Sequence, residues 1–99
     1  MNNYQKEAHK FAFYNDDHYP EYGLVEEVGE FMGKIAKSQR GDQELNQKDL
    51  KKELGDILWM LSEVCTKHNF TLQDIADSNL NKLKDRQERG VLSGNGDNR

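Results

Sequence analysis

The sequence predicts an all-α fold, in the form of a four-helix-type bundle. Apolar residues recur at helical spacing in the long segments, and alternation of the kind found in strands is missing along the chain. The 99 residues make one domain at most, with 34% hydrophobic residues and a mean hydropathy of −1.04. Because a small domain buries a smaller share of its surface, we expect oligomerisation to complete the core.

The first half of the chain predicts two helices. Residues 4–15 form the first, and residues 16–20 form a connection, because the residue before a proline is pushed away from helical backbone angles. The second helix is expected over residues 21–39. Its apolar side chains follow the i, i+4, i+7, i+8, i+11 series of an amphipathic helix: Leu24, Val28, Phe31, Met32 and Ile35.

The second half of the chain predicts two more helices. The polar stretch 40–49 contains a loop, and the third helix runs from about Lys48 to His68. In the sequence TLQD an acid follows a threonine by three residues, which is typical of a helix N-cap. The fourth helix therefore starts at about Thr71 and ends near Arg89.

Composition and charge limit the domain organisation and the partners. Residues 1–89 are expected to form a single all-α domain, and residues 90–99 a glycine-rich tail. The net charge of −4 and the pI near 5.3 disfavour nucleic acid or an anionic membrane as the main partner. No apolar run resembles a signal peptide or a membrane span, and the lone Cys65 excludes an internal disulfide. We expect a cytoplasmic protein.

Two pairs of acids lie on or beside the apolar faces. Glu27 and Glu30 are an i, i+3 pair in the second helix. Glu53 and Asp56 are such a pair in the third, and on a helical wheel Glu53 falls inside the apolar arc while Glu26 points away. Charge that faces an interior is costly and neighbouring acids repel each other, so a divalent cation such as Mg²⁺ or Mn²⁺ would relieve both effects. The alternative is a set of solvated surface acids.

The fourth helix carries polar and basic residues on its apolar side. Asn79, Lys82 and Arg86 follow the spacing i, i+3, i+7, and their side chains are suited to phosphate oxygens. The alternative is that the two cations lie along apolar surface or pair with the acids.

Several other residues have two interpretations. Trp59 lies off the apolar arc of the third helix, so it lines a subunit interface or stacks on a nucleobase. Lys34 and Lys37 follow the first acidic pair and are solvated residues or phosphate ligands. The histidines share no spacing typical of metal ligands and are interpreted as surface or ordinary packing residues: His9, His18 and His68.

Three segments of the chain, GLVEEVGE, KKELGDILWML and NLNKLKDR, resemble the MazG-like all-α nucleoside triphosphate pyrophosphohydrolases. The resemblance covers about residues 19–99, and the order and spacing of the motifs are its most specific features. It implies the Mg²⁺- or Mn²⁺-dependent hydrolysis of a (deoxy)nucleoside triphosphate to the monophosphate and pyrophosphate. It also implies a homodimer or homotetramer.

The same resemblance implies a role for each motif. The implied metal ligands are Glu27, Glu30, Glu53 and Asp56. The implied substrate ligands are Asn79, Lys82 and Arg86, to which Trp59 is added as the candidate stacking residue. The candidate catalytic acids are Glu26, as general base, and Glu30. Two alternatives stay open: a non-catalytic regulator that binds nucleotide and metal, and a phosphoribosyl-nucleotide pyrophosphohydrolase.

Overall fold

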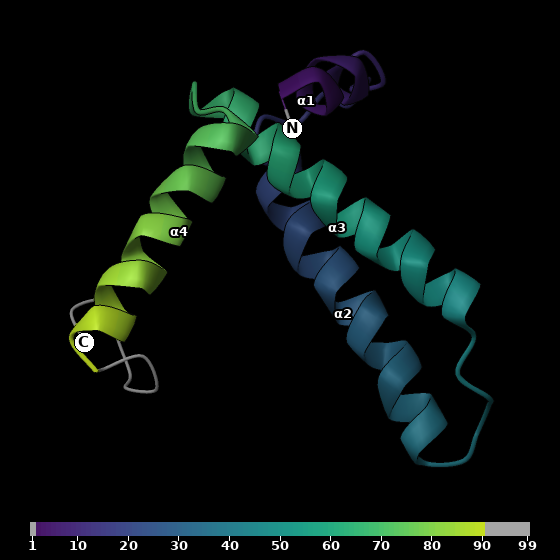
Figure 1. The fold of residues 1–99 in the computed structure, drawn as a ribbon. Helices are drawn as coiled ribbons and strands as arrows, with labels where there is room; N and C mark the ends of the chain where they lie inside the picture. Colours follow the sequence, from purple (N-terminus) through teal and green to yellow (C-terminus); the bar gives the residue numbers. More distant parts are fainter. Residues whose placement is uncertain (1, 91–99) are drawn as a thin grey trace.

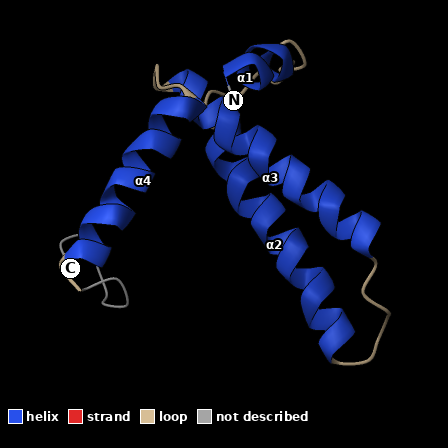
Figure 2. Cartoon of the chain, viewed as in Figure 1, coloured by secondary structure: helices blue, strands red, loops and turns tan. Residues whose placement is uncertain are grey.

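A computed structural model describes residues 2–90, which form four α-helices and no strand (Figure 1, Figure 2). The helices are α1 (Asn2–His9), α2 (Tyr19–Gln39), α3 (Gln47–Lys67) and α4 (Leu72–Glu88). The predicted all-α fold is confirmed. The predicted tail lies outside the described residues, apart from Gly90. None of the described helices combines the length and the apolar content needed to cross a membrane.

The helices α2 and α3 form an antiparallel hairpin and pack along their length (Figure 1). The helix α1 packs against α3 and α4 at the end of the hairpin where α3 finishes, and α4 then diverges from the hairpin (Figure 1). Among the described residues, the buried hydrophobic side chains are Met60, Cys65 and Leu72. The core is therefore small and lies near the junction of α3 with α4.

The helix α1 is shorter than the predicted helix 4–15. It ends at His9, and the chain turns so that the amide of Phe13 donates to the carbonyl of Phe11 at 3.1 Å. The hydroxyl of Tyr14 then donates to Glu63 of α3. This contact requires the chain to leave the helix, and tertiary contacts of this kind override helix propensity.

The other helix ends agree with their sequence signals to within two residues. Pro20 lies in the first turn of α2, where its missing N–H costs nothing, so the helix already begins at Tyr19. The Asn46 side chain accepts hydrogen bonds from two amides in the first turn of α3. The Thr71 hydroxyl accepts from the amide of Asp74 at 3.0 Å, which confirms the predicted N-cap of α4.

A buried glutamine fastens α1 to the junction of α3 and α4. The Gln5 side chain donates to the Thr66 hydroxyl and to the Phe70 carbonyl, both at 3.0 Å. Its carbonyl oxygen accepts from the amide of Leu72 at 2.9 Å. The amide group of Gln5 is therefore satisfied on both sides, as a buried polar group must be.

A buried carboxylate holds the segment after α1 in place. Glu63 is fully buried, and the Nδ1 atom of His9 lies 3.1 Å from each of its carboxylate oxygens. Burial and the hydrogen bond to this carboxylate raise the pKa of Tyr14. His9 thus joins the end of α1 to α3. The sequence pattern did not single out Glu63.

Because α2 and α3 approach closely at Gly23, we expect alanine substitutions at Gly23 and at Gly29 to change the stability in opposite directions. A Cβ at Gly23 would lie 2.2 Å from Sδ of the buried Met60, whereas one at Gly29 would meet nothing within 4 Å. We expect Gly23→Ala to lower the free energy of unfolding by about 1–3 kcal/mol through overpacking. Gly29→Ala should raise it by up to about 1 kcal/mol through helix propensity. Urea denaturation measures both, and shifts of the same sign would contradict the close contact.

Candidate metal centre

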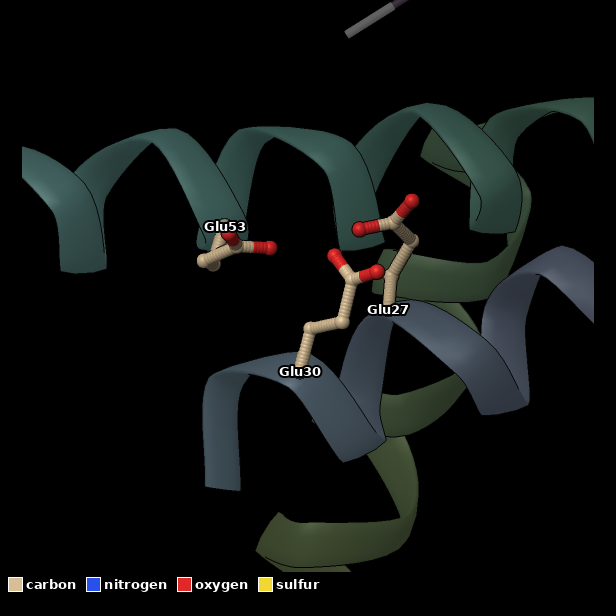
Figure 3. Close-up of side chains that lie close together, drawn as sticks. All are labelled: Glu27, Glu30 and Glu53. Atoms are coloured by element: carbon tan, nitrogen blue, oxygen red, sulfur yellow. The ribbon is translucent and has the colours of Figure 1, made fainter. Parts of the chain in front are cut away.

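Three glutamates from α2 and α3 meet between the two helices of the hairpin (Figure 3). Glu27 and Glu30 project from α2 toward α3, and Glu53 reaches the same space from α3 (Figure 3). One carboxylate oxygen of each residue lies within 4.8 Å of the others. The i, i+3 spacing explains the first pair, and the packing of the hairpin adds the third residue. We call these three residues the glutamate group.

The glutamate group is partly buried, and its negative charge is only partly compensated. The side chain of Glu53 is 15% exposed, and buried Oε2 atoms of Glu27 and Glu53 lack a hydrogen-bond partner. The pKa of Glu27 is raised to about 7, because burial disfavours the charged form and the charges of Glu30 and Asp56 add repulsion. A cation at this position would offset both effects.

Asp56, the fourth predicted ligand, lies beside the glutamate group. It is exposed and its carboxylate is outside the set of mutually close oxygens. Its charge still contributes to the raised pKa of Glu27, and also to the raised pKa of Tyr4 on α1, for which burial is the largest cause. The charge of Asp56 therefore acts on both the glutamate group and α1.

An apolar cavity of about 420 Å³ adjoins Asp56 between α1 and α3. The indole N–H of Trp59 donates to the carbonyl of Ala8 at 3.2 Å, so Trp59 is held under α1 of its own chain. The residues that line this aromatic cavity are Tyr4, Glu7, Ala8, Phe11, Gly55, Asp56 and Trp59.

The remaining predicted site residues lie outside the glutamate group. Glu26 is exposed on α2. Asn79 and Lys82 are exposed and Arg86 is 6% exposed, all on α4, which packs on α1 and diverges from the hairpin (Figure 1). Within one chain, the basic residues of α4 are therefore not gathered at the carboxylates.

A lysine that the sequence left ambiguous does reach the group. The Nζ atom of Lys34 lies 3.8 Å from Oε1 of Glu53. The signal for this position was its i+4 spacing from Glu30, which places both on one face of α2.

The donor set suits a hard divalent cation. Carboxylate oxygens are the ligands that Mg²⁺ and Mn²⁺ prefer in proteins. The two buried oxygens of the group accept no hydrogen bond from the described residues. The fold and the site together define a helical protein with a carboxylate cluster of a kind that suits a divalent cation.

Comparison with known proteins places this chain in a family. Residues 20–91 match the model of the MazG nucleotide pyrophosphohydrolase domain, so the chain belongs to that family. The chain is also 39% identical over 85 residues to "Gene 37 protein" of Mycobacterium phage L5, an alignment that covers 82% of this chain and 75% of that protein. No solved structure gives a significant match. The predicted MazG-like resemblance is confirmed, and membership suggests a nucleotide pyrophosphohydrolase.

Proposed function

We propose that this protein hydrolyses a nucleoside or deoxynucleoside triphosphate to the monophosphate and pyrophosphate, with Mg²⁺ as the cation and Mn²⁺ as a substitute. The observation that carries this proposal is the glutamate group, with its two buried unpartnered oxygens, in a chain of the MazG family. We propose that the protein acts on nucleotides in the cytoplasm.

The metal ligands that we propose are Glu27, Glu30 and Glu53, with Asp56 as the fourth. A bound divalent cation supplies Lewis acidity toward phosphate oxygens and lowers the pKa of water. Glu30 is the exposed member of the group, so it is the carboxylate with the best access to an attacking water. In the reaction a water oxygen bonds to the α-phosphorus, and Glu30 accepts the water proton. The bond between the α-phosphorus and the oxygen that bridges it to the β-phosphate breaks, and pyrophosphate leaves. Glu26 is the alternative base.

The aromatic cavity is the place that we propose for the nucleobase. Its volume of about 420 Å³ falls within the range of about 300–1,000 Å³ that is usual for ligand pockets. Tyr4, Phe11 and Trp59 offer aromatic surface for stacking, and Asp56 links the cavity to the glutamate group. Because Trp59 is the only tryptophan, nucleotide binding should change the intrinsic fluorescence of the protein. An unchanged spectrum at saturating nucleotide would place the base elsewhere.

A panel of nucleoside triphosphates tests the proposed reaction. The protein is incubated with each triphosphate and Mg²⁺, and we expect monophosphate and pyrophosphate as products. If the folded protein turns over none of them, the proposal is wrong. Tight binding without products would indicate the regulator, and selective cleavage of a phosphoribosyl-nucleotide would indicate the other enzyme class.

A second copy of the chain is the partner that we propose for α4. Apolar side chains on α2 and α4 are each more than a third exposed, including Val25, Met32, Ile75, Leu80 and Leu83. A small domain that leaves apolar side chains exposed gains stability by association, and soluble oligomers are mostly symmetric homo-oligomers. In a dimer, or a tetramer built from dimers, α4 of one copy would bring Asn79, Lys82 and Arg86 to the glutamate group of the other.

Subunit complementation tests this arrangement. Glu53→Gln removes a metal ligand and Lys82→Ala removes the phosphate contact of α4, so each variant alone should be inactive or nearly so. After random mixing of the unfolded chains and refolding, about half of the dimers are mixed and each has one intact site, so about a quarter of wild-type activity should return. Failure to recover activity, or a monomer in sedimentation experiments, would contradict the shared site.

A further inference from the structure

A small cavity with a charged lining lies at the end of the glutamate group that is farther from α1. It has a volume of about 230 Å³ and is lined by Glu30, Gly33, Lys34, Lys37 and Glu53. The three charged residues of α2 follow the spacing i, i+4, i+7 and so share one face of the helix. Gly33 lies on the same face, and a Cβ there would meet nothing within 4 Å, so this part of the surface is left open.

The contact of Lys34 with the glutamate group is an ion pair beyond hydrogen-bond distance. Its Nζ atom lies 3.8 Å from Oε1 of Glu53, while N–H···O hydrogen bonds need about 2.7–3.2 Å. The Lys34 side chain is 30% exposed, so it has room to move, and Oε2 of Glu53 is unpartnered. The lysine therefore compensates the carboxylates only in part.

We propose that Lys34, assisted by Lys37, binds the two terminal phosphates of the substrate, which leave as pyrophosphate. This inference rests on the proposed function. The cavity is smaller than the range of about 300–1,000 Å³ that is usual for whole ligands, so it suits a fragment such as phosphate. The aromatic cavity lies on the Asp56 side of the glutamate group and the two lysines lie on the other side, so a triphosphate that runs between them crosses the carboxylates.

The ion pair makes phosphate binding depend on the cation. Without a cation, Lys34 is a counter-charge for Glu53. When the carboxylates bind a divalent cation, they no longer compensate the charge of Lys34. The lysine then attracts phosphate oxygens. The cation and the phosphate should therefore promote each other's binding, and this coupling must be the same in both directions. The lysine also competes with the cation when phosphate is absent.

The variant Lys34→Met separates these effects. In calorimetry with Mg²⁺ alone, the variant should bind the cation more tightly, by about three- to tenfold, because the competing ammonium is gone. With Mg²⁺ present, inorganic pyrophosphate should bind at least about tenfold more weakly, a coupling of ordinary size. Binding of the nucleoside monophosphate should be unchanged. Lys51→Met is the matched control, because Lys51 is an exposed lysine of α3 that does not line the cavity.

Two further variants keep the inference testable if Lys34→Met is poorly folded. Lys34→Arg retains the charge and should retain pyrophosphate binding. Lys37→Met should weaken pyrophosphate binding without changing the Mg²⁺ affinity, because the exposed Lys37 has no ion pair with Glu53 among the described contacts.

The outcomes distinguish this inference from the proposed function. If wild-type protein hydrolyses triphosphates while Lys34→Met binds Mg²⁺ and pyrophosphate like the Lys51→Met control, the inference is wrong and the proposed function stands. A lowered melting temperature with unchanged pyrophosphate binding would also overturn it, because Lys34 would then only stabilise the fold. If the wild-type protein neither binds Mg²⁺ nor releases pyrophosphate, the proposed function fails.

Discussion

Glu27→Gln is expected to lower Mg²⁺-dependent turnover by at least about a hundredfold, because it removes a proposed metal ligand. At metal sites the loss of a contact that only orients a ligand already costs about 10–100-fold. Glutamine is close in size to glutamate, and removing a partly buried carboxylate also relieves the repulsion by Glu30 and Asp56. The variant should therefore stay folded while it loses affinity for Mg²⁺. Calorimetry with Mg²⁺ and a pyrophosphate-release assay measure the two effects.

The neighbouring Glu26→Gln is the matched control. It makes the same chemical change one residue away, at an exposed position outside the glutamate group. We expect normal Mg²⁺ affinity, because Glu26 is not among the proposed ligands. The kcat of this variant separates the two proposed bases, since a normal kcat supports Glu30 and a low kcat identifies Glu26. Equal loss of Mg²⁺ affinity in both variants would contradict the assignment of the metal centre to the space between α2 and α3.

The helices could be predicted where a local pattern decides the structure. The apolar series of α2 and the N-cap at Thr71 each act over a few residues, and the helices that they predict are confirmed. Val28 and Met32 of the series are nevertheless exposed in the single chain. The end of α1 depends on Glu63, whose hydrogen bond with Tyr14 joins residues 49 positions apart. A tertiary contact of this kind leaves no periodic signal near residue 10.

The same distinction applies to the candidate site. The meeting of Glu27, Glu30 and Glu53 follows from i, i+3 spacing on α2 and from the apolar face that joins α2 to α3. The direction of α4 does not follow from such a pattern. It is set at the turn after α3, where Asn69 adopts a positive φ of 62° and Gln5 of α1 caps the amide of Leu72. The position of the proposed substrate residues of α4 relative to the acids was therefore not predictable from spacing.

The raised pKa of Glu27 predicts opposite pH dependences for stability and for cation binding. Its folded value is about 7, against an ordinary value of 4.5, so between these values the folded protein holds a proton that the unfolded chain has lost. Stability linked to Glu27 is therefore fully present below about pH 4.5 and is lost as the pH rises through about 7. Melting of the metal-free protein across this range should show the decline, and Glu27→Gln should remove it while Glu26→Gln keeps it.

Cation binding has the reverse dependence, because the cation must displace the proton of Glu27. The Mg²⁺ affinity should rise about tenfold per pH unit below about 7 and level off above it. Calorimetry in buffers of different ionisation enthalpy should find up to one proton released per bound cation at the acidic end. An affinity that is constant from about pH 6 to pH 8 would contradict Glu27 as a ligand. If both dependences are found, the charge that destabilises the metal-free hairpin is the charge that binds the cation.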